Sequence, residues 1–230
     1  MNILAFDTAL DACSAALWSD GTVLARESVV AARGHAEILF PMLDRVLQTG
    51  GRAYADIDRF AVTIGPGSFT GVRVGVAAAR GLALGLAKPV VGVTTLEAIA
   101  AGAVYSPGET GHKTIKKIAA AIDARRGEIY FQIFDWDGSA HALEALIQPS
   151  AVTPEDAARQ LGAGPAMLVG SGANLVKAQL EDRTDVVCVA ASGLPGAGVL
   201  AEIAARRTVS PSQPPSPLYL RPPDAKLPTP

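Results

Sequence analysis

The 230-residue chain is poor in the side chains that most often build metal sites and disulfides. Its two cysteines, Cys13 and Cys188, belong to no C-x-x-C pair, so neither a disulfide framework nor a zinc ribbon is expected. The three histidines, His35, His112 and His141, stand alone, and none is part of an H-E-x-x-H motif. We therefore predict no metal site and a reducing cellular compartment.

A strong charge of either sign is also missing. With 20 basic and 22 acidic residues the formal net charge is -2, which gives no broad basic surface for unaided binding of nucleic acid. The N-terminus lacks the regions of a signal peptide. The apolar stretch 72–93 is interrupted by Arg73, Arg80, Lys88 and Pro89, which makes a membrane span a poor explanation. We expect a cytoplasmic protein that makes no membrane contact.

Common catalytic signatures are absent as well. No G-x-S-x-G elbow occurs, so Ser68 and Ser171 are interpreted as turn or cap residues rather than nucleophiles. No G-x-x-x-x-G-K-[ST] loop occurs either. Serine hydrolysis and P-loop nucleotide hydrolysis are therefore not expected.

The most informative segment that is present is a glycine-rich turn at residues 65–71, between an apolar strand and a helix of small residues. Its glycines are spaced G-x-G-x-x-x-G, and no acidic residue lies between Arg59 and Leu96. Both features disagree with a dinucleotide-binding Rossmann turn, which needs G-x-G-x-x-G and a carboxylate further on. We interpret the segment as a turn built for close packing.

Two distant segments share one plan, which indicates a degenerate duplication. Residues 3–29 read as strand, Asp7, turn and a two-stranded hairpin with an Asp-Gly signal, and residues 117–148 repeat this order around Asp123. Helical and strand patterns follow each copy. We predict two α/β units, each a meander with crossover helices.

The predicted boundaries follow from this repeat. An N-terminal unit covers residues 1–105, a C-terminal degenerate repeat covers 106–210, and a proline-rich tail covers 211–230. The apolar island Leu218-Tyr219-Leu220-Arg221 interrupts the tail. We interpret Tyr219 or Leu220 as an anchor of the tail on the body or on a partner.

Two helices are expected in the first unit. The first has apolar residues at helical spacing over 38–47, with Pro41 inside it, and the second covers about 69–86. The second carries Gly71, Gly75 and Ala79 on one ridge, and small residues there permit close approach of another element. The ridge is either an internal contact or a subunit interface, and both readings stay open.

Two strand-Asp-turn-strand segments are the plan of the superfamily of actin, sugar kinases and heat-shock ATPases. The predicted fold class is therefore α/β, with duplicated ribonuclease H-like units whose mixed sheets are flanked by helices. In that superfamily small residues wrap phosphates at the two turns. In this chain Thr8-Ala9-Leu10-Asp11 follows Asp7, and Ala124-Arg125-Arg126-Gly127 follows Asp123. Bulky side chains therefore occupy positions where glycines would contact the phosphates. We interpret both aspartates as turn-forming remnants of a nucleotide site.

The Gly170-Ser171-Gly172 turn is the best further remnant of such a site. By analogy with the superfamily it is an adenosine-binding turn, and the alternative is a plain connection from strand to helix.

Five motifs together resemble the bacterial TsaB family, whose proteins help to make threonylcarbamoyladenosine in tRNA. They are Phe6-Asp7-Thr8, Arg33-Gly34-His35, the turn 65–71, Asp123-Ala124-Arg125 and Tyr219-Leu220-Arg221. The resemblance covers nearly the whole chain. It implies a noncatalytic, actin-like scaffold or activating subunit that pairs with the catalytic subunit TsaD and works with the ATPase TsaE. It also implies only indirect contact with tRNA and no intrinsic cofactor, with ATP or ADP at the interface of the assembled complex.

The same resemblance implies that the first two helices are docking elements. The catalytic relatives carry an H-x-x-x-H metal pair on the first helix, and the matching positions here are His35 and Leu39, so the second ligand is missing. A homodimer through the same face is implied when the catalytic subunit is absent. The implied partner-binding residues are His35, Leu39, Met42, Leu43, Val46, Phe69, Val72, Arg73, Gly75, Val76 and Ala79.

Two other functions stay open. One is an active small-molecule kinase or peptidase of the same superfamily, against which Leu39, Arg125 and Arg126 argue. The other is a scaffold for a different partner, because an apolar helix face does not name what it binds.

Overall fold

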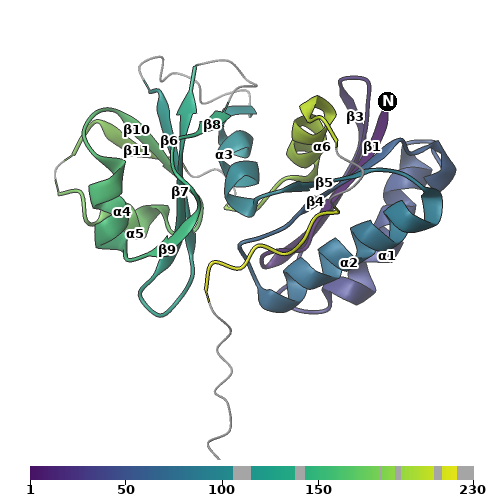
Figure 1. Ribbon diagram of the computed structural model, residues 1–230, viewed down its shortest axis with the longest axis horizontal. Helices are drawn as coiled ribbons and strands as arrows, with labels where there is room; N and C mark the ends of the chain where they lie inside the picture. Colours follow the sequence, from purple (N-terminus) through teal and green to yellow (C-terminus); the bar gives the residue numbers. More distant parts are fainter. Residues whose placement is uncertain (106–114, 138–142, 182, 190–192, 210–213, 222–230) are drawn as a thin grey trace, which may run out of the picture.

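The computed structural model describes residues 1–105, 115–137, 143–181, 183–189, 193–209 and 214–221, and two mixed sheets form its frame (Figure 1). His112, His141 and the outer parts of the proline-rich tail lie outside these residues.

The first sheet is a three-stranded meander extended by two parallel strands. Its strand order is β3-β2-β1-β4-β5, in which β4 and β5 run parallel to β1. Asp20 and Gly21 both have positive φ angles, as a tight hairpin turn between β2 and β3 requires. The strands are β1 (Asn2–Asp7), β2 (Ala12–Ser19), β3 (Thr22–Val30), β4 (Arg59–Thr63) and β5 (Val90–Val93).

The second sheet repeats this plan, in the order β11-β10-β6-β7-β8, with β9 also paired to β7. Again an antiparallel meander is followed by two strands parallel to its first strand. The duplication predicted from the sequence is therefore confirmed. The strands are β6 (Lys117–Asp123), β7 (Ile129–Trp136), β8 (Leu143–Ala145), β9 (Ser150–Val152), β10 (Ala166–Val169) and β11 (Val186–Cys188).

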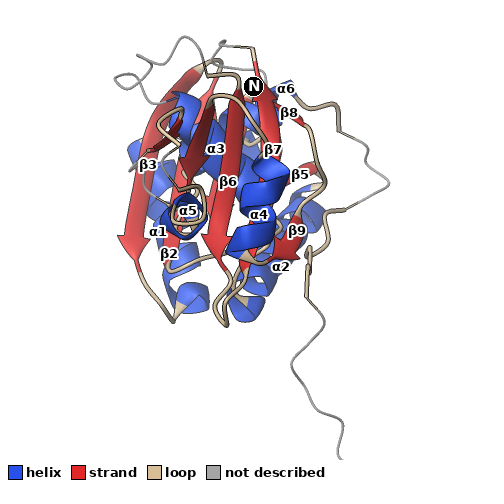
Figure 2. Cartoon of the chain, turned by 90° about the vertical axis from the view of Figure 1, so that its left-hand side faces the viewer, coloured by secondary structure: helices blue, strands red, loops and turns tan. Residues whose placement is uncertain are grey.

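Helices cover both faces of each sheet. α1 (His35–Thr49) and α2 (Phe69–Leu86) lie on the outer face of the first sheet, and α4 (Pro154–Leu161) and α5 (Ala173–Lys177) lie on the outer face of the second (Figures 1 and 2). α3 (Thr95–Tyr105) and α6 (Ala197–Arg206) lie between the sheets (Figure 1). A single 3₁₀ turn, η1 (Tyr54–Asp56), precedes β4.

α6 differs from the predicted division of the chain. It falls within the range 106–210, yet Leu200, Ala201 and Ala204 pack with Ile3 and Ala61 of the first sheet in one core cluster. The first unit is therefore built from two separate parts of the chain. The structure thus adds α6 to the predicted N-terminal unit 1–105.

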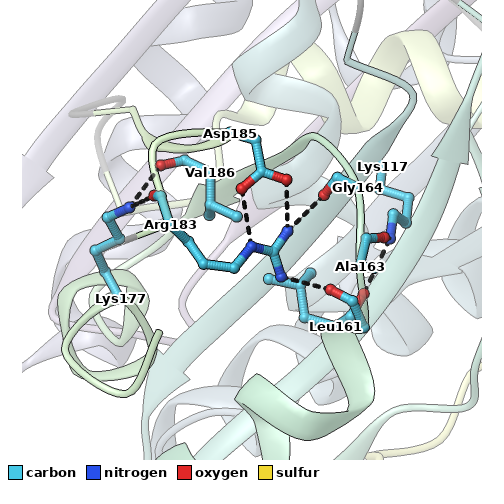
Figure 3. A network of polar contacts seen from close by, with 9 residues as sticks. Lys117, Leu161, Ala163, Gly164, Lys177, Arg183, Asp185 and Val186 are labelled. Atoms are coloured by element: carbon cyan, nitrogen blue, oxygen red, sulfur yellow. Dashed lines mark hydrogen bonds and ion pairs between the residues drawn. The ribbon is translucent and has the colours of Figure 1, made fainter. Parts of the chain in front are cut away.

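The outer side of the second unit is closed by basic side chains that bind backbone carbonyls (Figure 3). Lys117 donates to the carbonyl oxygens of Leu161 (3.0 Å), the last residue of α4, and of Ala163 (2.6 Å). The Arg183 guanidinium donates to the carbonyl oxygens of two glycines in the same loop and forms a bidentate pair with Asp185. These contacts satisfy carbonyls at the end of α4 and are structural.

Candidate functional site

The glycine-rich turn packs against the turn between β1 and β2. A Cβ atom added to Gly67 would lie 2.3 Å from the carbonyl oxygen of Ala9, and one added to Gly71 would lie 2.0 Å from that of Thr8. Ser68 N donates to Ala9 O (2.7 Å), and Thr8 Oγ1 donates to Gly71 O (2.7 Å). The chain's own backbone occupies the close approach that these glycines permit. The close-packing interpretation of the turn is confirmed.

Asp7 is enclosed by the same packing. Its side chain is fully buried, and its Oδ1 accepts hydrogen bonds from Ala9 N (3.0 Å) and from Thr63 Oγ1. Its Oδ2 has no partner among the described residues. Burial raises the pKa of this carboxyl to about 6, because the charged form is desolvated. Asp7 therefore has the position of a turn-forming core residue.

His35, the first residue of α1, is also buried, and its Nε2 donates to the carbonyl oxygen of Leu10 at 3.0 Å. Four residues later, Leu39 lies in the core. The imidazole thus joins the helix start to the turn after Asp7 and does not lie on the surface.

The second turn is arranged differently, because it faces an open pocket of about 440 Å³ between the two units. The Asp123 carboxylate accepts from Arg125 N (2.7 Å), and Asp123 N donates to Ser171 Oγ (3.0 Å). A Cβ atom on Gly170 would lie 2.3 Å from Ala121 O, and Gly172 N donates to that same oxygen (2.9 Å).

Of the residues predicted as nucleotide-site remnants, Asp123 lines this pocket beside Ser171, whereas Asp7, Gly170 and Gly172 do not. The pocket is lined by Leu10, Asp11, Ala32, Gly67, Ser68, Ile122, Asp123, Ala124, Arg125, Tyr130, Ser171, Gly193 and Leu194.

Most of the partner-binding residues predicted from the sequence face inward. Leu39, Met42, Leu43, Val46 and Ala79 belong to the core between the helices and the first sheet. These five side chains are corrected from surface to core positions, because helical spacing marks an apolar stripe but not what covers it.

The ridge on α2 is internal as well. A Cβ atom on Gly75 would lie 2.6 Å from Thr8 Oγ1, and Val72 and Val76 pack with Ala9 in a small buried cluster. Of the two readings left open for this ridge, the structure supports the internal contact. Phe69 and Arg73, by contrast, are exposed.

The outward face of the same two helices carries an open apolar groove that the sequence reasoning missed. Its volume is about 770 Å³, and Phe40 at its side is 46% exposed. The sequence did contain a signal for this groove, because a second apolar stripe runs along α2 beside the buried ridge. The lining residues are Ala36, Phe40, Tyr54, Val74, Ala77, Ala78, Gly81, Leu82, Gly85 and Leu86.

Within the described ranges, α2 alone has the length and composition of a membrane-spanning helix. Its buried side packs on the first sheet and its outer side lines the groove. These two faces account for its apolar character.

Known proteins share both the sequence and the fold of this chain. The family model described as TsaD, tRNA N6-adenosine threonylcarbamoyltransferase, matches residues 28–166. The tRNA threonylcarbamoyladenosine biosynthesis protein TsaB of Escherichia coli (strain K12) is 43% identical over 176 residues, which cover 75% of this chain and 72% of the relative. The chain belongs to the TsaB family. This membership connects it with the biosynthesis of threonylcarbamoyladenosine in tRNA.

Other members of the TsaB family agree. The TsaB protein of Bacillus subtilis (strain 168) is 30% identical over 184 residues, covering 79% of this chain and 76% of that protein. The solved structure of YeaZ from Pseudomonas aeruginosa superposes with a TM-score of 0.79 at 33% identity, over 95% of this chain and 99% of that one.

A more distant structure supports the fold alone. The activator of the 2-hydroxyisocaproyl-CoA dehydratase from Clostridium difficile superposes with a TM-score of 0.51 at 13% identity, over 89% of this chain and 94% of the other. With the two repeated sheets, this confirms the predicted fold class of duplicated ribonuclease H-like units of the actin-like ATPase type.

Proposed function

We propose that the chain is a noncatalytic scaffold or activating subunit in the formation of threonylcarbamoyladenosine in tRNA. It pairs with a TsaD-like catalytic subunit, works with a TsaE-like ATPase in the cytoplasm, and contacts tRNA only indirectly. The observation that carries this proposal is the open apolar groove on the outward face of α1 and α2.

The groove has the chemistry of a protein-docking surface. Leu84, which lies beside it on α2, is 86% exposed, and Phe40 extends the same apolar area from α1. Gly81 and Gly85 have open space where a Cβ atom would lie, so a partner's backbone can come close to α2. A contiguous apolar area of this kind typically marks a protein interface, and an amphipathic helix is a suitable occupant. We assign the groove to the catalytic subunit.

The remnant nucleotide site supports a noncatalytic role. The first turn is filled by Thr8 and Ala9, and Asp7 is held inside the core. No three His, Cys, Asp or Glu side chains come together as a metal site in the part of the chain that the structure describes. We propose that ATP or ADP binds at the interface of the assembled complex and that this chain has no intrinsic cofactor.

Binding to the catalytic subunit tests the groove. Phe40→Glu and Ala77→Arg place charge in the groove at exposed positions, and each is expected to weaken binding to a TsaD-like subunit at least about tenfold, measured by calorimetry. Leu175→Glu on α5 is the matched control, because Leu175 is similarly exposed at 42% but lies on the second unit. Unchanged affinity in both groove variants, with native circular dichroism, would remove this surface from consideration.

Transfer of the threonylcarbamoyl group tests the role. A reconstituted mixture of tRNA, preformed threonylcarbamoyl-adenylate, the catalytic subunit and the ATPase is expected to modify tRNA efficiently only when this chain is added. Equal modification without it would contradict the proposal. ATP turnover by the isolated chain, lost in Asp7→Asn, would instead favour the alternative of an active kinase of the same superfamily.

A further inference from the structure

The described end of the proline-rich tail lies along the first unit before it reaches the second (yellow in Figure 1). Leu218 N donates to Ile64 O at 2.7 Å, which continues the hydrogen bonding beyond the end of β4. A Cβ atom on Gly65 would lie 2.8 Å from Leu218 O, and one on Gly92 would lie 2.8 Å from Pro215 Cβ. The first unit therefore has no room for larger side chains where the tail passes.

Tyr219 attaches the tail to the start of α2. Arg73 Nε donates to the Tyr219 hydroxyl at 2.7 Å, and the Arg73 guanidinium carbon lies 3.4 Å from the centre of the Phe69 ring. The Phe69 and Tyr219 ring centres are 5.6 Å apart. One arginine thus joins two aromatic rings, one from the body and one from the tail.

Arg221 attaches the tail to the second unit. Its guanidinium donates to the carbonyl oxygens of Ala124 (2.9 Å) and Arg125 (3.1 Å) in the turn between β6 and β7, and it forms an ion pair with Glu128. It also lies 5.8 Å from the centre of the Tyr130 ring. Several charge-assisted contacts therefore converge on one side chain that is only 22% exposed.

We propose that Leu218–Arg221 is an interunit strap that holds the two units at one angle and so sets the width of the pocket between them. The two attachment points, Tyr219 and Arg221, are two residues apart, so their Cα atoms are separated by at most about 7 Å. A rotation that separates α2 from the β6–β7 turn must therefore break one attachment. Both attachment points adjoin the pocket, because Ser68, Arg125 and Tyr130 line it.

The strap is tested by the distance between the units. Leu24→Cys on β3, away from the groove, and the native Cys188 on β11 are exposed, whereas Cys13 is buried, so spin labels report one distance across the two units. The whole chain and a chain ending after Arg221 are expected to give the same narrow distance distribution. A chain ending after Pro217 is expected to give a broad one. An unchanged distribution in the chain ending after Pro217 would overturn the proposal.

Point variants keep the test decisive if the shortened chain folds poorly. Arg221→Ala in the whole chain is expected to broaden the distribution and to speed hydrogen exchange at the amides of Ala124 and Glu128 about tenfold. Tyr219→Phe keeps the ring, removes only the hydroxyl, and is expected to have a smaller effect than Tyr219→Ala. Native circular dichroism with unchanged exchange and unchanged distances in Arg221→Ala and Tyr219→Ala would show that the segment only rests on the surface. The result is independent of whether the chain binds a TsaD-like subunit.

Discussion

At the scale of single residues, Asp7 is a carboxylate enclosed by the packing of the chain itself. Asp7 ends β1, the glycine-rich turn packs against the turn that follows it, and Thr63 and Ala9 donate hydrogen bonds to one of its carboxylate oxygens. Keeping this buried carboxyl ionised costs folding free energy, and the cost depends on pH because it is present only when the group has lost its proton.

Asp7→Asn is expected to stabilise the chain at neutral pH. The pKa of Asp7 is raised from 3.8 to about 6 in the folded state, so its favourable contribution is full below pH 3.8 and is lost as pH rises through 6. The stability of Asp7→Asn relative to the native chain should therefore increase between pH 4 and pH 7, by at most about 3 kcal/mol. Urea unfolding at both pH values measures this. A difference that does not change with pH would contradict it.

At the scale of elements, α2 has two apolar faces with different surroundings. The face with Gly71 and Gly75 meets the first turn without space, and the face with Gly81 and Gly85 is open. Replacing a glycine by alanine is therefore expected to change the free energy of unfolding in opposite directions on the two faces.

Gly71→Ala and Gly81→Ala form a matched pair that tests this difference. The first adds a methyl group against the backbone of Thr8 and is expected to lower the free energy of unfolding by about 1–3 kcal/mol or more. The second meets nothing within 4 Å, removes the entropic cost of glycine in a helix, and is expected to raise it by about 0.5–1 kcal/mol. Thermal and urea unfolding compare them. Equal losses in both variants would show that α2 is enclosed on both sides.

The two faces of α2 also explain where sequence reasoning stopped. Helical periodicity located α1 and α2 and identified an apolar stripe on each, with Leu39 and Met42 on α1 and Val76 on α2, and the structure confirms the helices. Periodicity does not tell whether a stripe faces the protein's own sheet or a partner. The same two helices also carry exposed apolar residues, such as Phe40 on α1 and Ala77 on α2. Only the packing of the folded chain distinguishes this open face from the buried stripes.

At the scale of the whole molecule, the groove predicts self-association when no partner is present. Two copies that cover it with each other must bury about 1,200 Å² or more in total to form a stable dimer. We expect sedimentation velocity to show a dimer that dissociates on dilution, a monomer for Phe40→Glu, and an unchanged dimer for Leu175→Glu. A native chain that is monomeric at every concentration would contradict this expectation.

The duplication was predictable because Asp7 and Asp123 stand at matching places before matching hairpins. The place of α6 was not, because nothing in a local pattern states which sheet a late helix will cover. Arg59 shows the tertiary reason, since its guanidinium binds the carbonyl oxygens of Ala204 and Arg207 at the end of that helix.

The return of α6 to the first sheet has a consequence for synthesis on the ribosome. The inner face of that sheet, with Ile3, Ala5 and Ala61, is covered by residues of α6 that are among the last of the body to be translated. The second unit can complete its core while this face is still uncovered. Of the two units, the one whose sheet is made earlier therefore completes its core later.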